Sequence, residues 1–173
     1  MPTQRLVFVD ESGANTKLTG LYGRCPVGQR RVCPVPQGHD QTTPLIAGVR
    51  LRGPCAPWLF EGPMDGERFL AWVRQGLAPA LQPKDLVILD NLATHKVAGV
   101  RQAIEAVGAG LLYLPLYSPD FNPIENLWSQ VKAIRRALAP RTADQLLRAA
   151  ASAFDAISPA DCQSFFLHAH YAI

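Results

Sequence analysis

The chain has 173 residues, 48% of them hydrophobic, which is enough to bury the core of one compact domain. Its formal net charge of +3 allows an anionic partner such as nucleic acid but does not identify one. The four cysteines form no CxxC pair and no histidine stands at zinc-finger spacing, which argues against a thiolate zinc site. We find no secretory signal pattern and no apolar run long enough to span a bilayer, and therefore expect a cytoplasmic protein without membrane contact.

The amino-terminal third of the chain predicts strands. Residues 5–10, RLVFVD, form a β-branched and aromatic run, and polar residues follow it, so we expect a buried strand with Asp10 at its carboxyl end. Residues 20–37 are rich in glycine and proline and fit an irregular hairpin or edge strand. Residues 44–52 and 56–61 predict two further strands, so this third is expected to form an antiparallel meander.

Helices and a parallel strand pair follow. Residues 65–81 carry apolar side chains at helical spacing behind Asp65, a suitable N-cap. The next segments are a strand at 86–90, a helix from about 96 to 107 and a strand at 110–117, which predict a right-handed parallel crossover.

Two more helices are predicted near the end of the chain, one beginning at Asn122 and one over 142–157. We therefore expect an α/β fold in one domain over residues 1–173. Its mixed central sheet, an antiparallel meander plus parallel strands, is expected to be flanked by helices.

Three acidic residues stand where such a fold would bring them together. Asp10 and Asp90 each end a predicted strand, and ligand sites of α/β sheets lie at the carboxyl ends of strands. Glu125 lies in the first turn of a helix that follows a later strand. Carboxylates gathered in a dry site repel one another unless cations are bound, and Mg²⁺ prefers oxygen ligands that it can share with phosphate. The three acids therefore predict two divalent ions and phosphoryl transfer.

Each acid also has a structural explanation. Aspartate is frequent in turns, so Asp10 and Asp90 could simply end their strands. Asn122, Pro123 and Glu125 stand where an N-cap, an N1 proline and a capping-box glutamate belong. Composition and spacing leave both explanations open.

The sequence around the acids resembles a known family. The segments VFVDES at 7–12, VILDNLATHK at 87–96 and PLYSPDFNPIENLWSQVK at 115–132 resemble DDE transposases of the Tc-mariner superfamily, in particular the bacterial insertion sequence 630 family. Asp90 and Glu125 are separated by 34 residues, 91 to 124, a spacing similar to that family's. The SPDFNPIENLW stretch is the most specific of these signals.

The resemblance covers nearly the whole chain and implies a ribonuclease-H-like fold. It implies that Asp10, Asp90 and Glu125 are catalytic and hold two Mg²⁺ ions, for which Mn²⁺ can substitute, with Asp10 bridging them. The implied activity is hydrolytic cleavage of DNA phosphodiesters at transposon ends, followed by attack of the freed 3′-hydroxyl on target DNA, in transposition and recombination. It also implies a bacterial protein that joins the nucleoid when bound to DNA, as at least a dimer.

The chain departs from the family in two places. Asp10 leaves no room before it for the helix-turn-helix region with which full-length relatives read the element's ends. We therefore expect recognition to come from a separate polypeptide or an upstream reading-frame product. Around residues 20–36 the family often has a tryptophan near a Gly-x-Pro-x-Gly turn, whereas this chain reads LYGRCPVG.

Polar residues near the acids are expected to position them. Asn91 and Asn122 can do so through turn or cap chemistry, and His95 can contact phosphate or orient a water. A structural hydrogen bond at a helix start would explain His95 equally well. His168 and His170, like His39, have no partner pattern, and we interpret all three as non-catalytic.

Basic residues are candidates for contact with DNA. On a helical wheel Lys132 and Arg136 share the face of Glu125 and could hold a phosphate backbone, although a solvated surface explains them as well. Three arginines of the Gly/Pro-rich segment could also grip DNA or simply be exposed: Arg24, Arg30 and Arg31. Trp128 falls on the apolar stripe of its helix, so we expect it in the core and not stacked on a base.

Two other functions remain compatible with these residues. The first is another ribonuclease-H-like nuclease, acting on hybrids or branched DNA, against which the SPDFNPIE stretch argues. The second is a degenerate or domesticated domain that binds DNA without cutting, against which the three intact acids argue.

Overall fold

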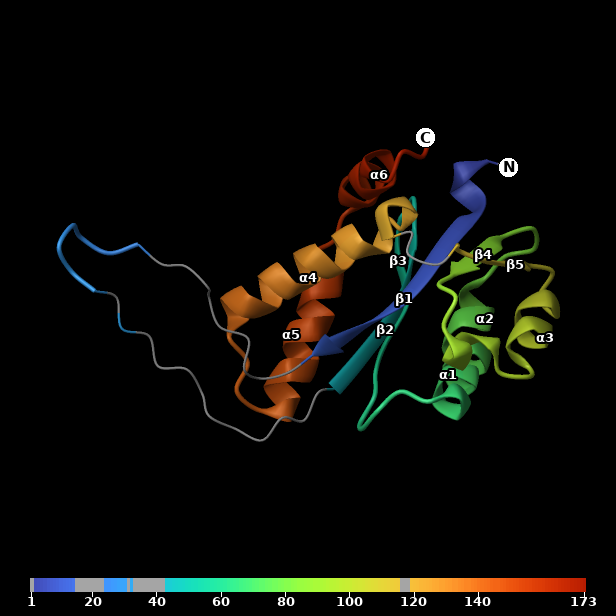
Figure 1. Ribbon diagram of the computed structural model, residues 1–173, viewed down its shortest axis with the longest axis horizontal. Coiled ribbons are helices and arrows are strands. Elements are labelled where there is room, and N and C mark those ends of the chain that lie inside the picture. The colour runs from blue at the N-terminus through green and yellow to red at the C-terminus, as the bar shows by residue number, and fades with distance from the viewer. Residues whose placement is uncertain (1, 15–23, 31, 33–42, 116–118) are drawn as a thin grey trace.

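A five-stranded mixed sheet forms the centre of the protein (Figure 1), in the order β3-β2-β1-β4-β5. The computed structural model describes residues 2–14, 24–30, 32, 43–115 and 119–173. The strands are β1 Leu6–Ala14, β2 Thr43–Arg50, β3 Gly53–Leu59, β4 Leu86–Leu89 and β5 Gly110–Tyr113. Strands β1, β2 and β3 pair antiparallel, whereas β1 with β4 and β4 with β5 pair parallel. The predicted meander and crossover are both confirmed.

Helices cover both faces of this sheet (Figure 1). The α-helices are α1 Gly66–Trp72, α2 Ala78–Ala80, α3 Val100–Glu105, α4 Ile124–Leu138, α5 Ala143–Asp155 and α6 Pro159–His168. A π-helical turn, η2 Val73–Leu77, joins α1 to α2. The short 3₁₀ helices are η1 Thr3–Arg5, η3 Ala93–Lys96 and η4 Pro119–Phe121.

The alternation of side chains along β1 divides the core into two layers. Leu6 and Phe8 belong to a cluster with residues of α4, α5 and α6, whereas Val7 and Val9 belong to a second cluster with residues of α1, η2 and α3. Phe8 meets Phe166 of α6 edge to face, with ring centroids 5.5 Å apart. All five side chains are buried, so β1 is covered on both faces up to Asp10.

The sequence predicts that Asp10 ends its strand, but in the structure the strand continues beyond it. β1 continues to Ala14 because the antiparallel register with β2 continues, pairing Asp10 with Ala47 and Ala14 with Thr43. The parallel register with β4 stops one residue before Asp10, at Val9 opposite Leu89. Asp10 therefore lies at the carboxyl end of the parallel pair although it is in the middle of its own strand.

Several helix starts follow from local cap chemistry. The Asp65 carboxylate accepts a hydrogen bond from the Arg68 backbone N–H at 2.9 Å, which confirms the predicted N-cap. Ser158 and Asp161 form a capping box at the start of α6, a helix that the sequence analysis did not predict separately. The Ser-Pro-x-Asp pattern at 158–161 was the signal for it.

Other boundaries differ from the prediction. The helix expected over 96–107 is divided into η3 and α3, and the strand expected over 110–117 ends at Tyr113. Most of residues 20–37 lies outside the described residues, and the described part, 24–30, forms an exposed turn. Within the described parts of the chain, no helix combines the length and apolar character that a bilayer crossing requires.

Candidate active site

Asp10 faces the helix that carries Glu125. Even-numbered residues of β1 pack toward α4, and Asp10 continues that alternation. The indole Nε1–H of Trp128, on α4, donates a hydrogen bond to Asp10 Oδ2 at 3.2 Å. Trp128 itself is 2% exposed and packs in the core, as expected from the sequence. Its contact with Asp10 was not predicted, because sequence spacing does not reveal which strand a helix will meet.

The Asp10 carboxyl is difficult to ionise in this environment. Burial, the largest cause, and the negative charges of Glu125 and Asp90 together raise its pKa to about 7, against the lowering effect of the hydrogen bonds from the Glu11 backbone and Trp128. Asp90 and Glu125 are therefore both within electrostatic reach of Asp10.

Asp90 follows directly after β4 and is held by its own loop. Its Oδ1 accepts a hydrogen bond from the Leu92 backbone N–H at 3.2 Å and forms an ion pair with His95 Nδ1. Burial raises the pKa of Asp90, but the hydrogen bond and positive charge of His95, together with the Leu92 amide, outweigh it, so the pKa is lowered overall. The Asp90 carboxyl therefore ionises more readily than that of an ordinary aspartate.

His95 connects Asp90 to a fourth carboxylate, that of Glu11. The imidazole is completely buried, and its Nε2 lies 3.1 Å from Glu11 Oε1. Burial lowers the pKa of His95, but its bonds to Asp90 and Glu11 outweigh burial and raise the pKa to about 9. The ring also packs against the tilted ring of Phe69 in α1, with centroids 4.3 Å apart. The Tyr113 hydroxyl donates a hydrogen bond to the backbone carbonyl of His95 at 3.1 Å.

Glu125 lies in the first turn of α4 and its side chain is exposed. The helix begins at Ile124, with Pro123 at the N-cap, two residues later than expected. The Asn122 side-chain oxygen accepts from the Ile124 backbone N–H at 3.4 Å, and no capping box involving Glu125 occurs in the described part of α4. The Glu125 carboxylate is therefore not taken up by the helix cap.

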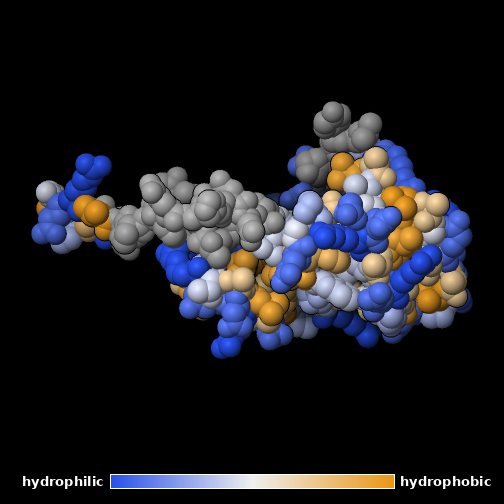
Figure 2. All heavy atoms as spheres, turned by 90° about the horizontal axis from the view of Figure 1, so that it is seen from below, coloured by the Kyte–Doolittle hydropathy of each residue, from blue (hydrophilic) through white to orange (hydrophobic). Residues whose placement is uncertain are grey.

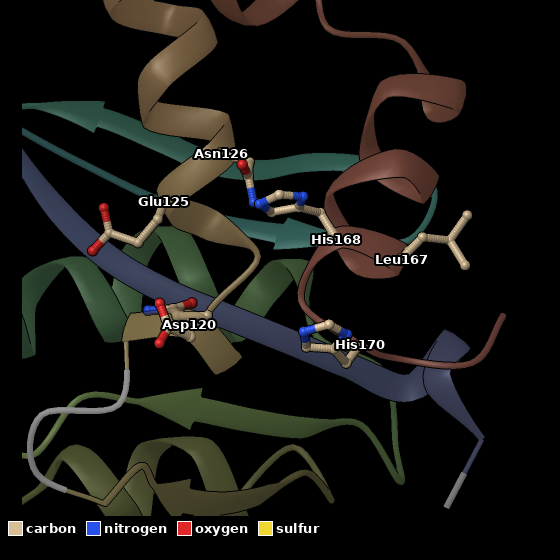
Figure 3. A pocket seen from close by; sticks show the side chains of 7 residues that line it. Asp120, Glu125, Asn126, Leu167, His168 and His170 are labelled. Atoms are coloured by element: carbon tan, nitrogen blue, oxygen red, sulfur yellow. The ribbon is translucent and has the colours of Figure 1, made fainter.

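A polar pocket of about 720 Å³ adjoins Glu125. Its lining comes from the region before α4, the first turn of α4 and the end of α6, and consists of Asp120, Asn122, Glu125, Asn126, Leu167, His168 and His170. Figure 3 shows Asn126 and His168 turned toward each other, with Glu125 on the opposite side of its helix. The sequence shows no partner pattern for the two histidines, because only the packing of α6 brings them beside α4.

The remaining predicted residues lie at different distances from the acids. Asn91 follows Asp90 and is half-buried, and Lys132 and Arg136 are half-buried further along α4. The exposed turn at 24–30, which includes two of the predicted arginines, lies well apart from the sheet in Figure 1 and from the main body of described residues in Figure 2. Arg31 lies outside the described residues.

The oxygen donors at this edge are suited to a hard divalent cation, because Asp10 is half-buried near two other carboxylates whose charge a cation would compensate. As they are placed, the described residues contain no group of three or more His, Cys, Asp or Glu side chains gathered closely enough to hold a metal ion.

The strand order and the flanking helices define the ribonuclease-H-like class of fold. A family model described as DDE superfamily endonuclease matches residues 5–147. The chain therefore belongs to this family. None of the curated proteins matches the chain.

Solved structures of Mos1 transposase share the fold. The Mos1 paired-end complex with left transposon end has a TM-score of 0.72 and 16% identity, covering 97% of this chain and 52% of that one. The Mos1 mariner paired-end complex with Mn has a TM-score of 0.76 and 17% identity, covering 96% and 52%. The catalytic domain of Mos1 mariner transposase has a TM-score of 0.63 and 17% identity, covering 96% and 76%. The chain thus spans about half the length of the first two proteins.

Proposed function

We propose that this chain is the catalytic domain of a transposase of the Tc-mariner superfamily, of the insertion sequence 630 type. It would cleave DNA phosphodiesters at transposon ends and join the freed 3′-hydroxyl to target DNA. The observation that supports this best is the half-buried Asp10 carboxyl with Asp90 and Glu125 in electrostatic reach, at the carboxyl end of the parallel strands. Family membership supports the same chemistry.

Asp10, Asp90 and Glu125 would hold two divalent ions, Mg²⁺ or Mn²⁺. Mos1 complexes have been solved with Mn and with Mg, which supports this choice for the present chain. Such ions, when bound, activate the attacking hydroxyl and neutralise the leaving oxygen. In this proposal the exposed Glu125 side chain completes the site by turning toward the other two acids.

The chain's own side chains prepare the acids for this task. Trp128 holds one oxygen of Asp10, and His95 holds one oxygen of Asp90. Both donors are buried, so the orientation that they impose does not depend on solvent. Preorganised ligands cost less free energy to arrange when substrate binds.

DNA would run along α4 from its first turn toward its carboxyl end. Lys132 and Arg136, two and three turns beyond Glu125, would contact phosphates, and the pocket beside Glu125 would accept the backbone next to the scissile bond, with His168 and His170 as its donors. Mos1 transposase has been solved in paired-end complexes, and we therefore expect two copies of this chain on two DNA ends.

The test is strand cleavage with purified protein. Labelled duplexes carrying the ends of the element that encodes the chain, and supercoiled plasmid, are incubated with Mg²⁺ or Mn²⁺ and with wild type, Asp90→Asn or Glu105→Gln. Glu105 is a matched control, because it is an exposed acid on α3 that pairs with Arg101 on the same helix, at 3.1 Å.

We expect nicking that requires a divalent ion, falls at least about a hundredfold in Asp90→Asn and is unchanged in Glu105→Gln. Equal activity of both variants would assign the nicking to a contaminant. Inactivity of the wild type on both DNAs, together with absent Mn²⁺ binding, would replace the proposal with a degenerate domain that binds DNA without cutting.

A further inference from the structure

We propose that Glu11 and His95 act together as positioning residues that fix the carboxylate of Asp90, and that Glu11 does so from behind the site without ligating metal. The inference rests on the proposed function, since Asp90 is a catalytic acid only in that proposal. It adds Glu11, a residue to which the sequence pattern assigns no role, and it defines what His95 does for Asp90.

The alternation of β1 separates the two neighbouring acids. Asp10 is on the side of α4, where Trp128 binds it, and Glu11 is on the opposite side, where His95 and α1 lie. Adjacent residues of a strand point to opposite faces, so these two carboxylates cannot serve one ligand from the same direction. Glu11 is therefore placed to support the site and not to line it.

His95 transmits that support to Asp90. Carboxylates only accept hydrogen bonds, so the imidazole donates its Nε2–H to Glu11, and its Nδ1 side forms the ion pair with Asp90. The bond to Glu11 fixes the orientation of the ring, in the same way that an outer partner orients a metal-ligating histidine.

The ring has little freedom to adjust in other directions. Phe69 covers one face at a centroid distance of 4.3 Å, and Tyr113 holds the backbone carbonyl of the same residue. The His95 side chain is 0% exposed, whereas that of Asp90 is 34% exposed and lies beyond the end of its strand. Without a rigid partner, the Asp90 carboxylate would exchange between rotamers, so the contact with His95 determines its position.

The test compares Glu11→Ala with Glu11→Gln. Glutamine keeps an oxygen acceptor for the Nε2–H of His95, whereas alanine removes it. We expect Glu11→Ala to lower kcat about ten- to a hundredfold with an unchanged KM for DNA, and Glu11→Gln to restore kcat to within about threefold of wild type. Glu67→Ala, which truncates an exposed glutamate of α1, is the matched control and should be silent.

Mn²⁺ titration separates positioning from ligation. Loss of Mn²⁺ affinity and of kcat in Glu11→Gln as severe as in Glu11→Ala would show that Glu11 is a ligand and would overturn the inference. An unchanged kcat in Glu11→Ala would also overturn it. Free energies of unfolding measured for each variant show whether a loss of kcat reflects a loss of folded protein.

Ring N–H signals in nitrogen-15 NMR spectra of the metal-free protein keep this inference distinguishable from the proposed function. We expect two protected His95 ring N–H signals in the wild type, and in Glu11→Ala loss of the Nε2–H signal together with faster exchange of the Nδ1–H. If the wild type neither cleaves DNA nor binds Mn²⁺, the function fails while these signals still decide the contact. An Nδ1–H that is as protected in Glu11→Ala as in the wild type would overturn the inference.

Discussion

The Trp128 indole donates to Asp10 Oδ2 at 3.2 Å and thereby ties the helix that carries Glu125 to the strand that carries Asp10. Trp128 lies one turn beyond Glu125 on α4, so the same helical segment presents one acid and restrains another. The relative position of Asp10 and Glu125 thus depends on the docking of α4 against β1. Four predictions follow from this arrangement and from the charges around it.

Replacing Trp128 with phenylalanine removes this hydrogen bond. Because the bond lowers the pKa of Asp10, we expect that pKa to rise, and the acid limb of the pH–rate profile to move up by about one pH unit, the equivalent of a charged hydrogen bond of roughly 1.5 kcal/mol. The free energy of unfolding should fall by about 1–2 kcal/mol. Phe154→Leu disturbs the ring that Trp128 contacts edge to face without touching Asp10, so an equal shift of the limb in that variant would contradict the prediction.

The metal-free protein should lose stability as pH rises through the weakly acidic range. Asp10 has a folded pKa of about 7, above the ordinary aspartate value of 3.8, so the folded state holds a proton that the unfolded state has released between these values. The slope of unfolding free energy against pH is then negative, at most about 1.4 kcal/mol per pH unit for this one group.

Asp10→Asn removes that titration and should flatten the curve. Urea unfolding of both proteins between pH 4 and 6.5 measures the difference, and this range lies below the pH window in which the contribution of His95 changes. His95 has a folded pKa of about 9, above 6.5, so its stabilisation is present below pH 6.5 and is lost as pH rises through 9. Parallel curves for wild type and Asp10→Asn would refute the assignment to Asp10.

Asp85 should matter for stability and not for the site. Asp85 directly precedes β4, whereas Asp90 directly follows it. The Asp85 side chain is completely buried, forms an ion pair with Arg50 at 2.8 Å and accepts a hydrogen bond from the Gln82 backbone N–H at 2.7 Å. Alanine at this position leaves the guanidinium without its partner, so we expect a loss of about 3 kcal/mol in unfolding free energy. Activity per folded molecule should be unchanged below the melting transition, and a specific loss of kcat would show that the two ends of β4 are coupled.

His168 and His170 should contribute to DNA binding and not to chemistry. If the pocket beside Glu125 receives the DNA backbone, alanine at both positions should raise the KM for DNA several-fold and leave kcat within about twofold. Strand cleavage at saturating and subsaturating DNA measures both quantities. Gln163→Ala, an exposed change on the same helix, is the control, and an unchanged KM in the double variant would remove the pocket from the DNA path.

Much of the fold could be predicted from local patterns. The β-branched run at 5–10, the alternating meander and the helical periodicity around Trp128 predicted the elements and the mixed sheet, because each depends on neighbours a few residues apart. The segments around Asp10, Asp90 and Glu125 also identified the candidate acids before any geometry was known. The length of β1 was missed because its register with β2 extends pairing through polar residues that look like a turn.

The partners of the acids were decided by the tertiary structure. Trp128 meets Asp10 across 118 positions of sequence, and His95 meets Glu11 across 84. Sequence determined which residues carry carboxylates and which side of β1 each one takes, since alternation is a local property. Which donor each carboxylate meets depends on how α4 and the loop after β4 pack on the sheet, and that packing depends on contacts along the whole chain.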